Sequence, residues 1–399
     1  MRIPSNKMVI ILCCLIFLVF GLFNGSTGPL LSELSQQSNS SLSAVGGVLT
    51  FLFFGAFIGM LTAGPLTERC GQKIVMIVSL VLLAVGIAGF SLVRNLPLMF
   101  AFFFMAGLGQ GGMEVSSNLV VSNAAVKNNT STLNLLHFFF GLGSFAGPAL
   151  VSLVISLNTP GRLVFWVAAV MFALLAVVFS LFYANQPVTK FAPADQPRPG
   201  GFQLYRSPLL WSIGVLLLAY VGIEIGVGSW STTYMGVAAS LSVEKAALVT
   251  SGYWGLLTLG RLTGVLVSRK LKHLQLLGVS ITGALLGGVA FFAATGNLSP
   301  AIAAILLIGF CFGQIYPTTI AVVTHLFTKD QGKAVGIISA MASLGGLTIP
   351  WLAGLLLEKQ GAKPFTLFTA AVIAVMLLAY FLSLRIRKHK NTSVTNGES

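Results

Sequence analysis

The sequence predicts an all-α membrane protein with twelve transmembrane helices in two pseudo-symmetric six-helix bundles. Three observations predict it: the composition, the spacing of the apolar stretches, and a repeat between the two halves of the chain. Of the 399 residues, 56% are hydrophobic and 8% are charged, and the mean hydropathy is +0.92. A soluble protein of this length could not bury so much apolar surface, so we expect a multi-pass membrane protein.

Twelve apolar stretches follow one another, each close to the length that crosses the roughly 30 Å core of a bilayer as a helix. They are expected at residues 8–34, 43–66, 74–93, 98–125, 131–157, 163–184, 208–236, 245–268, 274–295, 300–326, 333–357 and 365–385. The first stretch has no small-residue cleavage site and is longer than the apolar part of a signal peptide, so we keep it as a helix.

One long polar connection divides the chain. It predicts an N-terminal bundle at 1–184, a Pro- and Gly-rich cytoplasmic linker at 185–207, a C-terminal bundle at 208–385 and a cytoplasmic tail at 386–399. A weak repeat at an offset of 200 or 202 supports the division. The matched residues are Gly28 and Gly228, Gly55 and Gly255, Arg69 and Arg269, Gly107 and Gly309, and Pro148 and Pro350. Duplicated transporters keep such a repeat, with the solute site between the halves.

The distribution of Lys and Arg predicts the orientation. Seventeen of these residues lie on the side that holds both termini and the linker, and five lie on the other side. Basic loops stay in the cytoplasm, so both termini are expected there, in a protein of the cell (inner) membrane. This topology accounts for the net charge of +14, and no nucleic acid partner is expected. The four cysteines have no ligand-like spacing and predict neither disulfides nor a metal site.

The fourth stretch carries the polar residues on which the predicted function depends. Gln110, Glu114 and Asn118 recur four residues apart, so they share one helix face, and the glycines around them allow close helix packing. A carboxylate at this depth costs several kcal/mol unless it is protonated, paired or in contact with water. We expect the face to line a polar cavity in which Glu114 exchanges a proton. The alternative is a neutral Glu114 in a structural hydrogen bond.

Two other charged residues lie deep in the C-terminal half. Glu224 in the seventh stretch is a second candidate for proton coupling, with a structural or gating role as the alternative. Arg261 lies roughly 12 Å inside the eighth stretch, at a height comparable to that of Glu114. We predict Arg261 as the charge partner of Glu114; otherwise its side chain extends to the cytoplasmic interface.

Several uncharged side chains are candidate contacts for a solute, in addition to Gln110 and Asn118. They are Asn24, His137, Trp230, Trp254, Gln314 and Tyr316. Aromatic rings stack on sugars, but in membrane helices they are also packing residues and interface anchors. His137 precedes three phenylalanines and is interpreted as a packing residue, with a proton relay as the alternative. No nucleophile–base set or phosphate loop is present, so an enzyme is not expected, and no cofactor beyond the coupling proton.

A resemblance to a known family comes from residues 64–73, Gly-Pro-Leu-Thr-Glu-Arg-Cys-Gly-Gln-Lys, which we interpret as a tight cytoplasmic turn with Glu68 and Arg69 as a conformational latch. It resembles the helix 2–3 loop of the major facilitator superfamily, with Glu68 and Gln72 in place of an Asp and a basic residue. Segments 107–118, 136–141 and 220–230, and more loosely 314–319, resemble the fucose–galactose–glucose:proton symporter branch of that superfamily.

The resemblance implies the major facilitator fold, alternating access of the two bundles, a central sugar site and proton coupling by Glu114. Gln110 and Asn118 would contact sugar hydroxyls. The symporter branch has a helix 1 aspartate where this chain has Asn24. We therefore expect proton-coupled uptake of a sugar or similar polyhydroxylated solute, by a monomer surrounded by membrane lipids. Proton-driven export of an amphipathic compound or lipid, favoured by the Phe-rich stretches, and a non-transporting sensor or scaffold are the alternatives.

Overall fold

The computed structural model describes residues 6–124, 129–182, 204–267, 270–327 and 331–395, and all regular elements in these ranges are helices. The first six are α1 (Asn6–Ser38), α2 (Leu42–Cys70), α3 (Gln72–Leu92), α4 (Leu96–Ala124), α5 (Asn129–Ser156) and α6 (Leu163–Phe182). The others are α8 (Pro208–Ala239), α9 (Val243–Val267), α10 (His273–Ala293), α11 (Leu298–Phe312), α12 (Ile315–Leu326), α13 (Gln331–Gln360) and α14 (Ala362–Thr395).

Most of the described helices have the length and composition of membrane spans. Eleven segments qualify, with α11 and α12 together forming one of them, Leu298–Leu326. α9, which carries Arg261, is not among the eleven, but its 25 residues are enough to cross a bilayer. Large exposed side chains such as Leu92 and Leu181 are apolar, as expected of surfaces that face lipid. The all-α membrane fold predicted from the sequence is confirmed.

Two helix ends differ from the predicted stretches. α2 continues through Pro65 to Cys70, and the chain reverses at Gly71, whose φ of 86° is a conformation that favours glycine. The predicted ten-residue turn is therefore wrong in extent, because residues 64–70 are helical. α14 extends to Thr395, through most of the predicted tail. Most of the predicted linker lies outside the described residues.

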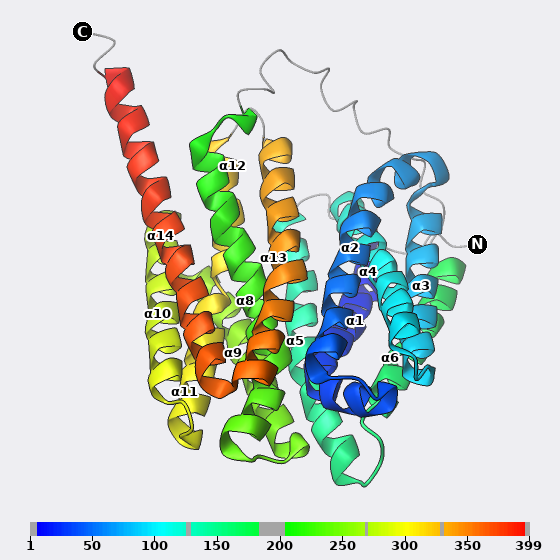
Figure 1. Ribbon diagram of the computed structural model, residues 1–399. Coiled ribbons are helices and arrows are strands. Elements are labelled where there is room, and N and C mark those ends of the chain that lie inside the picture. The colour runs from blue at the N-terminus through cyan, green and yellow to red at the C-terminus, as the bar shows by residue number, and fades with distance from the viewer. Residues whose placement is uncertain (1–5, 125–128, 183–203, 268–269, 328–330, 396–399) are drawn as a thin grey trace. The chain divides into compact units, whose positions relative to one another are not determined.

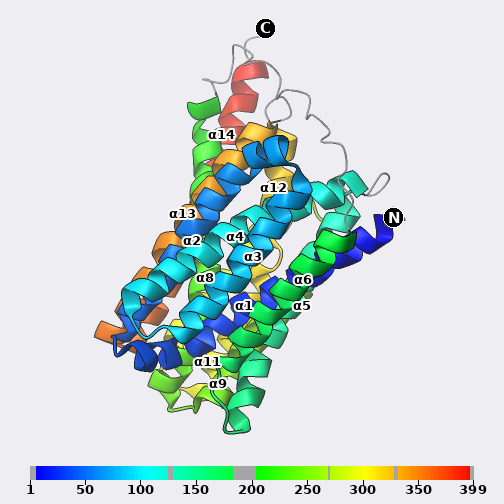
Figure 2. The ribbon, with the colours of Figure 1, turned by 90° about the vertical axis from the view of Figure 1, so that its right-hand side faces the viewer.

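The chain forms two compact units. The first comprises Met1–Phe191 and Gly228–Thr258, and the second comprises Ala192–Val227 and Leu259–Ser399, so α8 and α9 are each divided between them. In the first unit α2 packs along α4, α1 packs along α5, and α3 packs against α4 and α6 (Figure 2). In the second, α10 packs against α11 and α14, and α13 packs against α14 (Figure 1).

Glycines set the distance between helices in the first unit. On α1, Gly21 and Gly25 lie directly against backbone atoms of Phe140 and Ser144 on α5, and Gly143 of α5 lies against the carbonyl of Leu18. A Cβ atom at any of these glycines would overlap the backbone of the neighbouring helix. Close backbone approach of this kind replaces the hydrophobic effect, which is absent between helices that are surrounded by lipid tails.

Candidate functional site

The position of α4 is fixed by glycines on two sides. Gly107 and Gly111 lie against backbone atoms of α2, from Leu52 to Met60, whereas Gly109 and Gly112 lie against Ser79 of α3. Because these contacts involve backbone or short side chains, α4 has little freedom to move away from α2 or α3. The polar face of α4 is therefore presented by a helix that is held tightly in place.

Gln110, Glu114 and Asn118 occupy this polar face. The side chain of Gln110 is only 5% exposed, and its Oε1 has no hydrogen-bond partner among the described residues. The Oδ1 of Asn118 is also buried and without a partner there. Glu114 is partly exposed and forms no hydrogen bond or ion pair with the described residues. Two acceptors without donors thus lie one helical turn on each side of an unpaired carboxyl group.

Asn24 and His137 come from helices that pack beside α4, because α1 contacts both α4 and α5. The amide of Asn24 donates a hydrogen bond to the carbonyl oxygen of Phe20, one turn earlier, at 3.1 Å. The ring of His137 meets Phe17 edge-on, with centroids 5.7 Å apart. This contact agrees with the interpretation of His137 as a packing residue, and a role for Asn24 in solute binding stays a prediction.

In the second unit, Arg261 pairs with Glu224. The Nη2 of Arg261 lies 3.5 Å from the Oε1 of Glu224, and Tyr220 interacts with both side chains. The predicted pairing of Arg261 with Glu114 stays a prediction, because the two residues belong to different units, whereas the pair with Glu224 lies within one unit.

Tyr220 also marks a break between α11 and α12. Its hydroxyl donates a hydrogen bond of 3.0 Å to the carbonyl oxygen of Phe312, the last residue of α11. Carbonyls in the last turn of a helix need such outside donors. The break spans Gly313 and Gln314, four and three residues before Pro317, which has no N–H to continue the helical hydrogen bonds. This break was not predicted from the sequence, although Gly313 and Pro317 are its signals.

Gln314 and Tyr316 have different surroundings near the break. The amide nitrogen of Gln314 lies 3.5 Å from the Oγ1 of Thr263, and its oxygen accepts from Ser280 at 3.4 Å. Gln314 therefore links α9, α10 and the start of α12, which is the arrangement of a structural polar residue. Tyr316 is partly exposed, and its ring centroid lies 6.4 Å from that of Tyr220.

The two tryptophans predicted as ligand contacts are buried in the first unit. Trp230 is completely buried and packs against Gly46 of α2. Trp254 packs against Gly228, and its Nε1–H has no partner among the described residues. The arrangement of Trp230 is that of a packing residue, whereas Trp254 retains an unused donor. Of the predicted latch, Arg69 is exposed at the end of α2, and the side chain of Glu68 lies outside the described residues.

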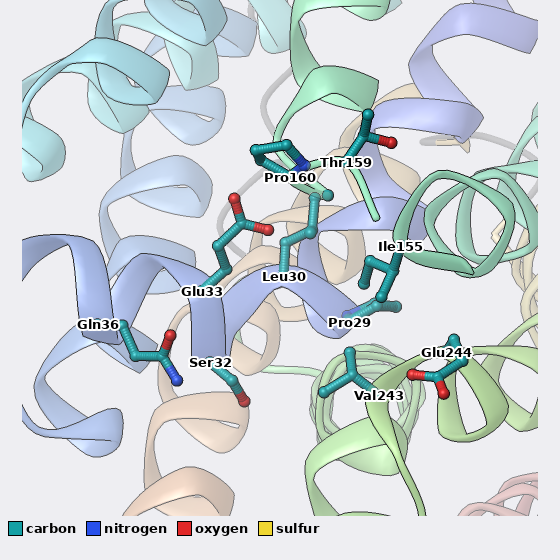
Figure 3. Close-up of a pocket in the computed structure, with 11 residues that line it drawn as sticks. Pro29, Leu30, Ser32, Glu33, Gln36, Ile155, Thr159, Pro160, Val243 and Glu244 are labelled. Carbon is teal, nitrogen blue, oxygen red and sulfur yellow. The ribbon is translucent and has the colours of Figure 1, made fainter. Parts of the chain in front are cut away.

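A pocket of about 310 Å³ lies in the first unit, where Glu33 of α1, Thr159 and Glu244 of α9 are among its lining residues (Figure 3). None of the residues predicted from the sequence lines it. Both carboxylate oxygens of Glu33 accept from the backbone N–H of Arg162 at 3.3 Å, and the Arg162 Nε is 3.9 Å away. Glu33 therefore ties the α5–α6 connection to α1, which is a structural role.

Solved structures share this fold. A bacterial homologue of the human lysosomal transporter Spinster, in an inward-facing and occupied conformation, matches with a TM-score of 0.78 and 16% identity, over 97% of this chain and 98% of that chain. The Escherichia coli fucose:proton symporter matches with a TM-score of 0.66 and 20% identity, over 95% of this chain and 99% of that chain. At these identities the likeness shows the fold alone.

Relatives align along most of the chain. A glucose/galactose transporter of Brucella abortus is 26% identical, over 84% of this chain and 84% of the relative. Bypass of stop codon protein 6 of Saccharomyces cerevisiae is 23% identical, over 95% and 83%. Sodium-dependent glucose transporter 1 of Homo sapiens is 22% identical, over 90% and 75%.

The family itself follows from a match that covers nearly the whole sequence. The Major Facilitator Superfamily matches residues 13–327 and, in a second overlapping match, residues 276–399. The helical architecture and the relatives agree with it, and none of these findings indicates an enzyme. The chain therefore belongs to the Major Facilitator Superfamily of membrane transporters.

Proposed function

We propose that this protein carries a sugar, or a similar small polyhydroxylated solute, across the membrane and couples its movement to a proton through Glu114. The observation that carries the proposal is the polar face of α4, where the buried acceptors of Gln110 and Asn118 lie on either side of an unpaired carboxyl group. Buried acceptors without donors are costly, and hydroxyl groups supply the missing donors. An apolar analogue would leave them unsatisfied.

The relatives support the solute class, since two of them are named as glucose transporters. The coupling ion differs among similar proteins: sodium in the name of the human relative and a proton in that of the fucose symporter. The proposal of a proton rests on Glu114, because a single carboxyl group is enough to take up and release a proton.

The proposed cycle depends on the charge of Glu114. An unpaired carboxylate in an apolar span costs several kcal/mol. The solute site of the loaded carrier therefore switches from one side of the membrane to the other while Glu114 is protonated and neutral. Release of the proton on the cytoplasmic side restores the charge, and the Oε atoms then need water as a partner. Because the loaded carrier switches sides only when Glu114 is protonated, uptake of the solute depends on proton binding.

The experiment uses purified protein in proteoliposomes with radiolabelled hexoses and a pH-sensitive dye outside. Wild-type protein is expected to make the outer medium more alkaline when hexose is added, and to accumulate hexose under a proton gradient but not under a sodium gradient. Glu114→Gln should lose both the alkalinisation and the accumulation, and retain exchange of labelled for unlabelled hexose. Normal gradient-driven accumulation by Glu114→Gln would contradict the proposal.

The matched control is the same Glu-to-Gln substitution at a glutamate outside the α4 face. Glu244→Gln removes a carboxylate at the beginning of α9, far along the chain from the α4 face. This variant should transport as the wild type does. If both variants lose coupling equally, the loss reflects damage to the fold and not the role assigned to Glu114.

The rival function, export of an amphipathic compound or lipid, drew on the Phe-rich stretches. In the structure these rings pack between helices: Phe103 stacks on Phe90 at 4.0 Å, and Phe140 lies 5.0 Å from Phe20. Phe102 fills the space beside Gly89 of α3. Helix packing accounts for Phe102, Phe103 and Phe140, which weakens the argument for export that the Phe-rich stretches supplied.

A further inference from the structure

Two histidine rings lie against each other in the second unit. His273 is the first residue of α10, and His325 lies in the last turn of α12. Their ring centroids are 5.5 Å apart, and the ring planes are inclined to each other by 24°. His325 is exposed and His273 is half-buried, so a solvated ion can reach the pair. The proposed solute site and the proposed coupling group involve neither histidine.

Both rings are carried by helices that are anchored close to them. The hydroxyl of Tyr380 on α14 donates a hydrogen bond of 2.8 Å to the carbonyl oxygen of Leu274, the residue next to His273. α12 packs against α10, and the side-chain oxygen of Gln314, the residue before α12, accepts from Ser280 of α10 at 3.4 Å. The two imidazoles are therefore brought together by the packing of the helices, and a ligand that joins them meets a preformed pair.

The separation of the rings fits two ligands of one metal ion. Imidazole nitrogens bind zinc at about 2.0–2.1 Å, and a tetrahedral angle between two such bonds places the ring centroids roughly 5 Å apart. The centroid distance of 5.5 Å between His273 and His325 is close to that value. Imidazole binds zinc, copper and nickel well, whereas calcium and magnesium prefer oxygen ligands. The pair therefore has the chemistry of a transition-metal site.

We propose that His273 and His325 together bind one divalent transition-metal ion, such as zinc, and thereby fasten the end of α12 to the beginning of α10. Catalytic and structural zinc sites have three or four protein ligands, and here the exposure of His325 lets water take the remaining positions. Because Gln314 already links the beginning of α12 to α10, the ion attaches α12 to α10 at both ends. The site is independent of the solute and of the coupling ion.

The test measures zinc binding to the purified full chain, prepared without a histidine tag and with Cys70→Ser, which removes an exposed thiol. This parent protein competes with a zinc-sensitive dye for ZnCl₂, and its apparent thermal midpoint is recorded in EDTA, ZnCl₂, NiCl₂ and CaCl₂. We expect one bound zinc ion per chain. We also expect a higher midpoint with zinc or nickel but not with calcium, because a ligand that binds the folded protein stabilises it.

His273→Gln and His325→Gln should each weaken zinc binding at least about tenfold, because even a group that only orients a metal ligand contributes about 10–100-fold to the affinity. Both variants should also lose the rise of the midpoint in zinc. The matched control is Lys272→Gln, which changes the exposed residue beside His273, keeps both imidazoles and should bind zinc as the parent protein does.

The midpoints in EDTA separate lost binding from lost folding, and the exposed His325 is expected to tolerate glutamine without a lower midpoint. A parent protein that binds no zinc in the dye competition would overturn the proposal. Zinc binding at full strength by either histidine variant would also overturn it, because the ion would then have ligands elsewhere in the chain.

Discussion

Glu224 of α8 and Arg261 of α9 form an ion pair within helices of the second unit. The side chain of Glu224 is 8% exposed and that of Arg261 is 21% exposed, and the two lie 3.5 Å apart. For a buried pair, the loss of hydration roughly offsets the attraction between the charges, whereas a single charge left behind is strongly unfavourable. The two residues are therefore expected to act as a unit.

Removing Arg261 alone should destabilise the protein more than removing both charges. Arg261→Met leaves Glu224 without its partner, and a cost of about 3 kcal/mol is expected. The double variant Glu224→Gln/Arg261→Met should recover most of it. The measurement is the apparent thermal midpoint of all variants in detergent, analysed as a double-mutant cycle. Losses that simply add would show that the two side chains do not depend on each other.

The same residues show how far single side chains can be predicted from the sequence. The spacing of Gln110, Glu114 and Asn118 placed them on one face, and α4 is indeed a continuous helix across all three. The pairing of Arg261 with Glu224 was not predicted, because it depends on how α8 and α9 are shifted against each other. Periodicity within one helix contains no information about that shift.

The packing of α4 against α2 and α3 depends on its glycines. Gly107 contacts the backbone of α2, which cannot move aside as a flexible side chain would. The glycine-rich stretch of α4 therefore has two functions: it brings α2 and α3 close, and it leaves only one face for the polar residues.

Gly107→Ala should destabilise the protein by about 1–3 kcal/mol, the usual cost of inserting a methyl group into a tightly packed contact. The matched control is Gly64→Ala in α2, where an added Cβ has no neighbour within 4 Å. Alanine favours the helix there by about 0.5–1 kcal/mol, so a neutral or slightly stabilising effect is expected. Both are measured as apparent thermal midpoints, and similar losses for the two would rule out the packing explanation.

At the level of elements, the apolar stretches were predictable and their ends were not. The second apolar stretch was expected to end at residue 66, yet α2 continues through Pro65 to Cys70. The break after Phe312 was hidden inside a continuous apolar stretch, since hydropathy does not distinguish one helix from two that are stacked end to end.

For the whole molecule, the orientation in the membrane stays a prediction from the Lys and Arg distribution. Cys70 is a natural reporter for it, because it is exposed at the end of α2, whereas Cys13 and Cys14 are buried. A membrane-impermeant maleimide should fail to label Cys70 in intact cells and label it in inside-out vesicles. Lys245→Cys in a Cys70→Ser background is the matched control and should give the opposite pattern. Labelling of Cys70 from outside would reverse the proposed topology.

The division into two halves was predictable only in part. The repeat and the linker indicated bundles at 1–184 and 208–385, and this division stays a prediction, because residues 183–203 lie outside the described chain. By contacts, the compact units instead divide α8 after Val227 and α9 after Thr258. Tertiary packing decides which part of α8 or α9 associates with which neighbouring helices. No local sequence pattern predicts this division.

The interruption after Phe312 also affects how the protein is made. The 29 residues of Leu298–Leu326 form one apolar segment, which the insertion machinery would recognise as a single span. Folded, they are rods of 15 and 12 residues, about 22 and 18 Å long, and neither alone reaches across the hydrocarbon core. Tyr220 belongs to α8, which is synthesised before this segment, so the hydroxyl that bonds the carbonyl of Phe312 is already in the chain when the two rods are inserted.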